Sequence, residues 1–165
     1  IGPLTNPAQA PRQLLGVFDG RYVEMMAQAL TRLGSDRALV VHGSDGMDEA
    51  TTTGPSLAAL STHNATQTFT LHPADFGVET TNREELEARD LDHAVAIARE
   101  VLSGVRGPHR DIVLFNSALG LLIADSGNPD FASPAARADA IARAADAVDS
   151  GRALRCLQSL VECSR

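Results

Sequence analysis

Two short apolar runs enclose an amphipathic stretch near the start of the chain. Residues 13–18 form the first run and residues 38–41 form the second. Asp19 can cap a helix over residues 20–33, and Gly34 can end it. The apolar positions at helical spacing on one face of this helix are Tyr22, Met25, Met26, Ala29, Leu30 and Leu33. A strand, a helix and a second strand in this order are typical of a βαβ unit with parallel strands.

The middle of the chain has the pattern of a hairpin, and the remainder is helical. Residues 56–60 and 65–71 are short β-like runs, and threonines alternate with other side chains in the second run. This period of two suits an exposed strand or hairpin. Beyond these runs the pattern predicts helices over residues 82–88, 91–102, 110–124, 134–148 and 151–163.

Together these elements predict an α/β fold in which helices pack around a mainly parallel central sheet. The length of 165 residues is that of one ordinary domain. The strands counted above are few for such a sheet, so an edge or a face of it would be left uncovered. Uncovered edges and apolar faces promote association. We therefore expect either that the chain pairs with further polypeptide or that it rearranges.

Composition and charge narrow the classes of partner. Hydrophobic residues make up 44% and charged residues 21%, which is the composition of a globular protein. The net charge is −7, and the basic residues are scattered, which argues against nucleic acid and anionic membranes as partners. Apolar runs fall short of the ~20 residues that span a bilayer. Cys156 and Cys163 lie about two helical turns apart, too far for a disulfide. We expect a cytoplasmic protein.

The segment of greatest chemical interest follows the second predicted strand. Residues 40–49 pass from a buried strand through a glycine-bracketed turn to Asp48 and Glu49. Ligands of open parallel sheets collect beyond the carboxyl ends of the strands, and adjacent carboxylates can converge on Mg²⁺. On the residues alone, an ordinary turn with solvated carboxylates is the alternative. We expect His42 to be a hydrogen-bonded structural histidine and Asn116 to bond to a neighbouring loop.

Known catalytic signatures do not explain the chain. The sequence contains no G-x-S-x-G elbow, Walker loop, G-x-G-x-x-G or H-E-x-x-H motif, and its five histidines share no metal-ligand spacing. No side chain is therefore assigned as a catalytic nucleophile, acid or base. The opening residues 2–8 are rigid and proline-rich, and such a segment is either a wall against a flat ligand or a plain connector.

Six segments, in chain order, resemble the anthranilate phosphoribosyltransferase family. They are residues 2–8, 15–18, 41–49, 73–77, 110–116 and 149–151. The most specific is the pattern His-Gly-x-Asp-Gly-x-Asp-Glu of residues 42–49. The resemblance covers essentially the whole chain and corresponds to the C-terminal half of the family.

The resemblance implies a type III phosphoribosyltransferase with the nucleoside phosphorylase/phosphoribosyltransferase-like fold. Such enzymes act in tryptophan biosynthesis: they join anthranilate to the ribose carbon of phosphoribosyl pyrophosphate and release pyrophosphate, with Mg²⁺ on the diphosphate. By the same resemblance, Asp48 and Glu49 match the acidic pair that holds magnesium. Pro3 matches the loop proline that lines the anthranilate channel. The anthranilate amine attacks the sugar directly, so no protein nucleophile is required.

Residues 1–165 would then be only the C-terminal part of the phosphoribosyltransferase α/β domain. The glycine-rich phosphate loop and the helical N-terminal domain of the family have no counterpart here, and a start at Ile1 agrees with a fragment. We expect a missing N-terminal half as partner, a homodimer for the full protein, and no catalysis by this chain alone. Two alternatives stay open: a pyrimidine nucleoside phosphorylase-like enzyme, and a non-enzymatic scaffold that assembles with another chain.

Overall fold

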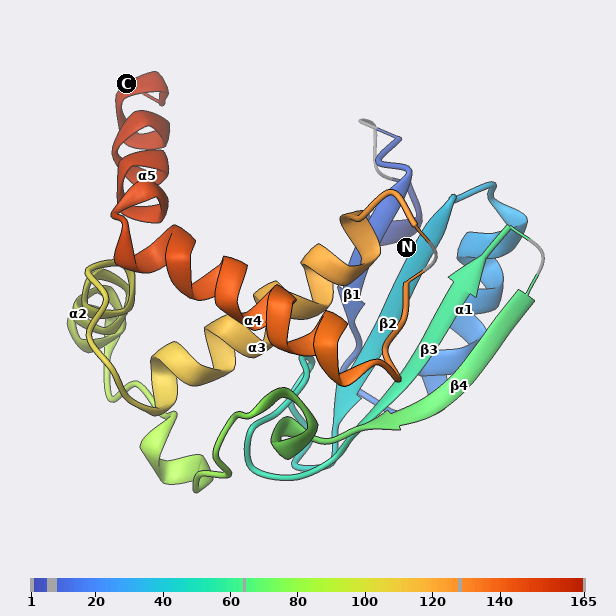
Figure 1. Ribbon diagram of the computed structural model, residues 1–165, viewed down its shortest axis with the longest axis horizontal. Helices are drawn as coiled ribbons and strands as arrows, with labels where there is room; N and C mark the ends of the chain where they lie inside the picture. The colour runs from blue at the N-terminus through green and yellow to red at the C-terminus, as the bar shows by residue number, and fades with distance from the viewer. Residues whose placement is uncertain (1, 6–8, 64, 128, 165) are drawn as a thin grey trace.

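A four-stranded sheet with helices on both faces organises the chain (Figure 1). The structure is a computed structural model that describes residues 2–5, 9–63, 65–127 and 129–164. The first half contains η1 (Gly2–Thr5), β1 (Arg12–Gly16), α1 (Arg21–Arg32), β2 (Arg37–Gly43), β3 (Ser56–Thr62) and β4 (Ala65–Leu71). The second half contains η2 (Pro73–Phe76), η3 (Arg83–Glu85), α2 (Leu91–Leu102), α3 (Pro108–Ala124), α4 (Pro134–Asp149) and α5 (Arg152–Cys163).

The strands lie in the order β1-β2-β3-β4. β1 pairs with β2 in parallel, as the strand–helix–strand pattern predicted, and Leu14 lies opposite Leu39. The two other pairs, β2–β3 and β3–β4, are antiparallel. The α/β class is confirmed, but the sheet of the described residues is mixed rather than mainly parallel. Parallel neighbours need a crossover of about a dozen residues or more, usually a helix. The connection between β3 and β4 is too short for one, and the loop of residues 44–55 between β2 and β3 contains no helix.

β2 divides the core between the two faces of the sheet. Leu39 and Val41 are buried against α3, in the cluster that contains Phe115. Ala38 and Val40 are buried on the opposite face, in the cluster formed with α1. Because successive side chains of a strand point to opposite faces, a strand covered on both sides is apolar throughout. The uninterrupted apolar run of β2 follows from this burial.

The buried stripe of α1 differs from the one that the sequence predicted. The structure buries Val23, Ala27 and Leu30 against the sheet. Two residues of the predicted face, Met25 and Leu33, are 60% and 62% exposed. Positions 23, 27 and 30 are spaced by four and three residues and therefore share one side of a helix. Tyr22 and Met26 flank that side, and the apolar spacing alone did not separate the two registers.

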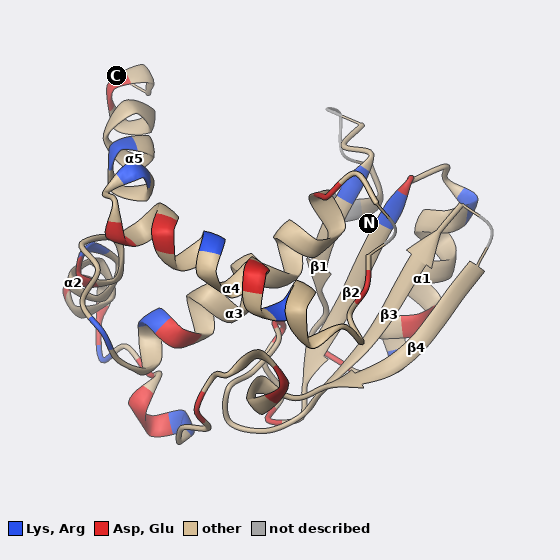
Figure 2. Cartoon of the chain, in the orientation of Figure 1, with Lys and Arg blue, Asp and Glu red and all other residues tan. Residues whose placement is uncertain are grey.

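The later helices follow the predicted ranges closely, apart from the first. The short helix predicted over residues 82–88 is the 3-10 helix η3, which spans only Arg83–Glu85. α3 is the central helix and buries eight of its residues, whereas α5 buries none and projects away from the sheet (Figure 1). Acidic and basic residues are interspersed along these helices (Figure 2). Within the described residues, every helix is too short or too polar to cross a membrane.

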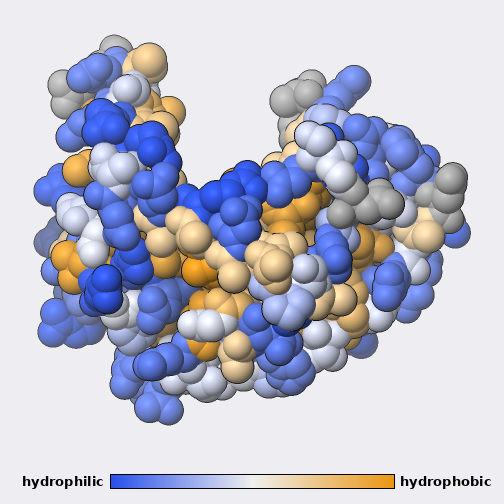
Figure 3. All heavy atoms as spheres, in the orientation of Figure 1, coloured by the Kyte–Doolittle hydropathy of each residue, from blue (hydrophilic) through white to orange (hydrophobic). Residues whose placement is uncertain are grey.

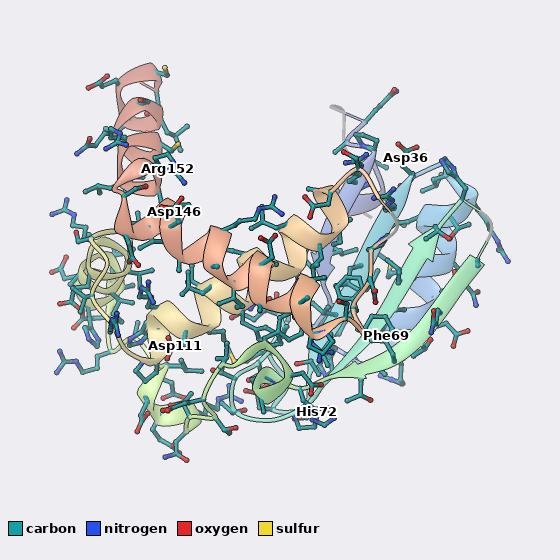
Figure 4. The ribbon with its side chains drawn as sticks, viewed as in Figure 1. Asp36, Phe69, His72, Asp111, Asp146 and Arg152 are labelled. Carbon is teal, nitrogen blue, oxygen red and sulfur yellow. The ribbon has the colours of Figure 1, made fainter. Side chains whose placement is uncertain are left out.

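Among the ion pairs of the helical half, one links α3 to the end of α4 and another spans the junction of α4 and α5. Arg110, near the start of α3, is only 9% exposed, and its Nη2 donates to both carboxylate oxygens of Asp149 at 2.8 and 3.0 Å. This pair joins two of the segments that carry the family resemblance. Asp146 and Arg152 form a second pair at 2.6 Å across the junction of α4 and α5 (Figure 4). Apolar side chains reach the surface in the hollow between α5 and the sheet (Figure 3).

Candidate functional site

The candidate site lies at the carboxyl ends of the two parallel strands. β1 ends at Gly16 and β2 ends at Gly43. Because the two strands are parallel, both carboxyl ends lie on the same side of the sheet (Figure 1). The loop of residues 44–55 begins at these carboxyl ends, as predicted for a ligand-binding loop. Beside it, Nδ1 of His42 lies 2.8 Å from the carbonyl oxygen of Val17. The prediction of a structural role for this histidine is confirmed.

Asp45 organises the interior of the loop. Its carboxylate accepts hydrogen bonds from Oγ1 of Thr51 at 2.7 Å and Oγ1 of Thr53 at 2.8 Å. The backbone N–H of Met47 donates to it at 3.1 Å. Partial burial raises the pKa of Asp45, but these three donors outweigh burial and leave the pKa lowered. Sequence reasoning missed this role, although an Asp in a Gly-x-Asp-Gly turn with threonines six and eight residues later was a usable signal.

We predict that Asp45→Asn lowers the free energy of unfolding by about 2 kcal/mol at pH 7, because an ionised acceptor with three donors is lost. A carboxyl with a lowered folded-state pKa contributes stability above its unfolded pKa of about 3.9 and loses it as the pH falls through the folded value. The deficit of the variant should therefore shrink below about pH 4. Urea unfolding from pH 7 to pH 3 measures it, with exposed Asp92→Asn as the control. A deficit that stays constant with pH would contradict this role.

Asp48 and Glu49 are adjacent residues in the middle of the loop. Asp48 is exposed and Glu49 is half-buried. Burial raises the pKa of Glu49, and the neighbouring charges of Asp48 and Asp45 raise it further. Within the described residues, neither Asp48 nor Glu49 forms an ion pair. A hard divalent cation would relieve this concentrated negative charge, and carboxylate oxygens are the ligands it prefers. The pair therefore fits part of a magnesium site.

Two residues from other elements fix the backbone around the acidic pair. A Cβ added to Gly16 would lie 1.5 Å from the carbonyl oxygen of Asp48, so β1 and the loop are in direct backbone contact. On α3, Oδ1 of Asn116 accepts from the N–H of Ala50 at 3.0 Å. Its Nδ2 donates to the carbonyl oxygens of Ala50 at 2.8 Å and of Ile112 at 3.0 Å. The predicted bond of Asn116 to a neighbouring loop is confirmed.

The segment around η3 covers the outer side of the loop. The N–H of Thr81 donates to the carbonyl oxygen of Thr52 at 3.1 Å. Nη1 of Arg83 donates to the carbonyl oxygen of Asp45 at 2.8 Å, and its Nε lies 3.5 Å from Glu87. A guanidinium is thus held over the backbone of the acidic loop. Arg83 is the first residue of η3, so this short helix positions the guanidinium for the contact.

The residues that the structure describes supply only part of a metal site. Among them, no group of three or more His, Cys, Asp or Glu side chains is arranged to hold a metal ion. Mg²⁺ commonly takes one or two protein carboxylates and completes its shell with substrate phosphates and water. Asp48 and Glu49 would supply these one or two carboxylates. The remaining ligands would have to come from substrate or from other polypeptide.

The structure does not bring the opening segment to the acidic pair. Leu4 and Thr5 of η1 line a cavity together with the residues that end α1, Leu33, Gly34 and Ser35. The last residues of α1, which line this cavity, and the loop of residues 44–55 lie at opposite ends of the strands (Figure 1). The backbone of Pro3 belongs to η1, but its side chain and residues 6–8 lie outside the described part of the chain. The role of Pro3 stays a prediction.

Comparison with known proteins identifies consistent relatives. The family model described as "Glycosyl transferase family, a/b domain" matches residues 1–154. The chain is 47% identical over 161 residues to the anthranilate phosphoribosyltransferase of Moorella thermoacetica, covering 98% of this chain and 45% of that protein. It is 44% identical over 161 residues to that of Rhodospirillum rubrum, covering 98% of this chain and 44% of the relative.

Solved structures of the same enzyme share the fold. Anthranilate phosphoribosyltransferase from Thermus thermophilus superimposes with a TM-score of 0.81 and 33% identity over 98% of this chain and 45% of that one. The enzyme from Saccharomyces cerevisiae in complex with PRPP and Mg gives a TM-score of 0.80 and 26% identity over 95% of this chain and 44% of that one. The chain spans less than half the length of the relatives it matches.

Proposed function

The chain belongs to the glycosyl transferase family of this a/b domain, and from that premise we propose that it is the C-terminal part of an anthranilate phosphoribosyltransferase. The reaction transfers the phosphoribosyl group of phosphoribosyl pyrophosphate to anthranilate and releases pyrophosphate, in tryptophan biosynthesis. The observation that carries the proposal is the Asp48–Glu49 pair at the carboxyl edge of β1 and β2. A missing N-terminal half, a homodimer and a cytoplasmic location belong to the same proposal.

The proposed chemistry needs charge stabilisation rather than a protein nucleophile. The amine of anthranilate attacks the anomeric carbon, the bond from that carbon to the pyrophosphate oxygen breaks, and the electron pair leaves with pyrophosphate. The attacking nitrogen becomes positively charged and loses one proton, to water or to the released pyrophosphate, which gives the neutral product. Mg²⁺, when bound, neutralises charge that grows on the leaving diphosphate. Asp48 and Glu49 are the side chains of this chain that would hold the ion. Asp45 is engaged inside the loop by Thr51 and Thr53, and these bonds close the loop that carries the pair.

The proposed wall for anthranilate lies apart from the acidic pair. Pro3 would line the channel of the flat aromatic ring, as the family resemblance implies. η1 lies near the amino end of β1, whereas the acidic pair lies beyond the carboxyl ends of β1 and β2. In the full protein, the N-terminal half would therefore have to supply the surface that connects the two. This geometry supports the expectation that residues 1–165 do not catalyse the reaction alone.

A fluorescence assay tests the proposal. The full-length protein that contains this chain should consume anthranilate fluorescence when phosphoribosyl pyrophosphate and Mg²⁺ are present, and should show no phosphorolysis of thymidine with phosphate. Residues 1–165 alone should show no turnover, and addition of the separately expressed N-terminal half should restore it. Thymidine phosphorolysis without anthranilate consumption would point to the nucleoside phosphorylase alternative. Absence of both activities would favour a scaffold.

A further inference from the structure

Asn116 is the side chain that ties the acidic loop to the protein core. We propose that Asn116 is a positioning residue for the magnesium-binding carboxylates Asp48 and Glu49. The proposal rests on the function proposed above and adds a residue to its machinery. Asn116 lies on α3, 66 positions after Ala50 in the chain, and it is not among the acidic residues of the loop.

The hydrogen bonds of Asn116 form a two-point clamp. Ala50 is fully buried, and its backbone N–H and C=O have no backbone partner among the described residues. Both groups are bound by the one amide of Asn116, at 3.0 and 2.8 Å. The second hydrogen of Nδ2 goes to the carbonyl oxygen of Ile112 at 3.0 Å, which fixes the rotation of the amide. Such an arrangement imitates a neighbouring β-strand and determines where the Ala50 backbone lies.

The clamp acts on the acidic pair because Ala50 follows Glu49 directly. On the other side of the pair, the carbonyl of Asp48 is in contact with the backbone of Gly16. Asp48 and Glu49 are therefore held between one point on β1 and one point on α3. Metal ligands must be placed to within about 0.5 Å, and residues that orient them change metal affinity by about 10- to 100-fold when removed.

α3 is a suitable anchor for this purpose. Phe115, Ala118 and Leu119, which surround Asn116 along the helix, are fully buried in the core cluster that also contains Ala50. Asn116 itself is half-buried, but the helix that carries it cannot shift without disturbing these close-packed neighbours. The core on the α3 face of the sheet therefore defines the position of the acidic pair through the Asn116 amide.

The test uses the full-length protein with two readouts. Asn116→Ala should raise the Mg²⁺ concentration for half-maximal anthranilate turnover by about tenfold or more, with the maximal rate largely recovered at high Mg²⁺. In the metal-free protein, it should speed hydrogen exchange of the Ala50 amide by about a hundredfold. Asn116→Asp keeps an acceptor for the Ala50 N–H but faces its carbonyl with a second acceptor, so it should shift both readouts in the same direction.

Leu122→Ala is the matched control, because Leu122 lies in the same core cluster further along α3. It should lower stability yet leave the half-saturating Mg²⁺ concentration unchanged. Unchanged Ala50 exchange in Asn116→Ala would overturn the clamp. Faster exchange with an unchanged Mg²⁺ dependence would overturn the positioning role and leave a purely structural one. A wild-type protein without transferase activity would instead contradict the proposed function. The exchange measurement would still show whether Asn116 fixes the Ala50 backbone.

Discussion

The double variant Asp48→Asn, Glu49→Gln should lower kcat/KM for phosphoribosyl pyrophosphate by about 10²- to 10³-fold in the full-length protein. The substitution keeps the size of both side chains and removes the charge that would bind Mg²⁺. The loss should not be recovered by added Mg²⁺, in contrast to Asn116→Ala, because the ligands themselves are changed. Steady-state assays over a range of Mg²⁺ concentrations measure the effect.

The same variant should lose activity without losing stability. The pKa of Glu49 is raised by burial and by the charges of Asp48 and Asp45, so the ionised folded state is disfavoured. A raised folded-state pKa means that stability is gained as the pH falls through that value, and that ionised Glu49 costs stability at pH 7. Glu49→Gln removes this cost. Urea unfolding at pH 7 should therefore show a variant at least as stable as the wild type.

A matched charge control separates a local from a general electrostatic effect. Asp36 directly precedes β2 and therefore lies at the other end of the strands from the acidic pair (Figure 4). Nε2 of His63 lies 3.4 Å from its carboxylate. Asp36→Asn combined with Glu24→Gln on α1 removes the same formal charge and should leave kcat/KM within about twofold of the wild type. Equal losses in the two double variants would show that net charge, and not the acidic pair, controls the reaction.

Gly16→Ala should destabilise the protein by about 3 kcal/mol, the upper part of the range for forcing an extra group into a packed interior. The new Cβ would lie 1.5 Å from the carbonyl oxygen of Asp48, which is backbone and cannot rotate away. β1 or the acidic loop must therefore move. Because the displaced residue is one of the acidic pair, the full-length variant should also need more Mg²⁺ for activity. Thermal and urea unfolding measure the first effect.

Gly120→Ala provides the control for this substitution. Gly120 lies inside α3, and a Cβ added there would meet nothing within 4 Å. Alanine favours a helix interior over glycine, so this variant should gain about 0.5–1 kcal/mol. The pair of variants makes the same chemical change with opposite expected signs. A Gly16→Ala protein as stable as the wild type would mean that β1 does not press against the loop.

Local patterns predicted the elements whose causes are local. α2 begins and ends at the predicted residues, and its start is capped by the side chain of Asp90, which accepts the N–H of His93 at 2.7 Å. The hairpin of β3 and β4 and the parallel pairing of β1 with β2 also followed from spacing along the chain. The buried face of α1 did not, because two apolar registers overlap on that helix and only contact with the sheet selects Val23, Ala27 and Leu30.

The sequence by itself determined the α/β class and the contiguous acidic segment, because each depends on residues that are neighbours in the chain or on their periodicity. The resemblance of six segments indicated the family. Tertiary structure alone decided what holds that segment. Gly16 touches Asp48 from another strand, and Asn116 reaches Ala50 across 66 positions. Asp45, to which the sequence analysis assigned no role, binds Thr51 and Thr53 inside the loop. No spacing rule encodes such contacts, since they arise only when the packed sheet and α3 bring distant backbone groups within hydrogen-bonding distance.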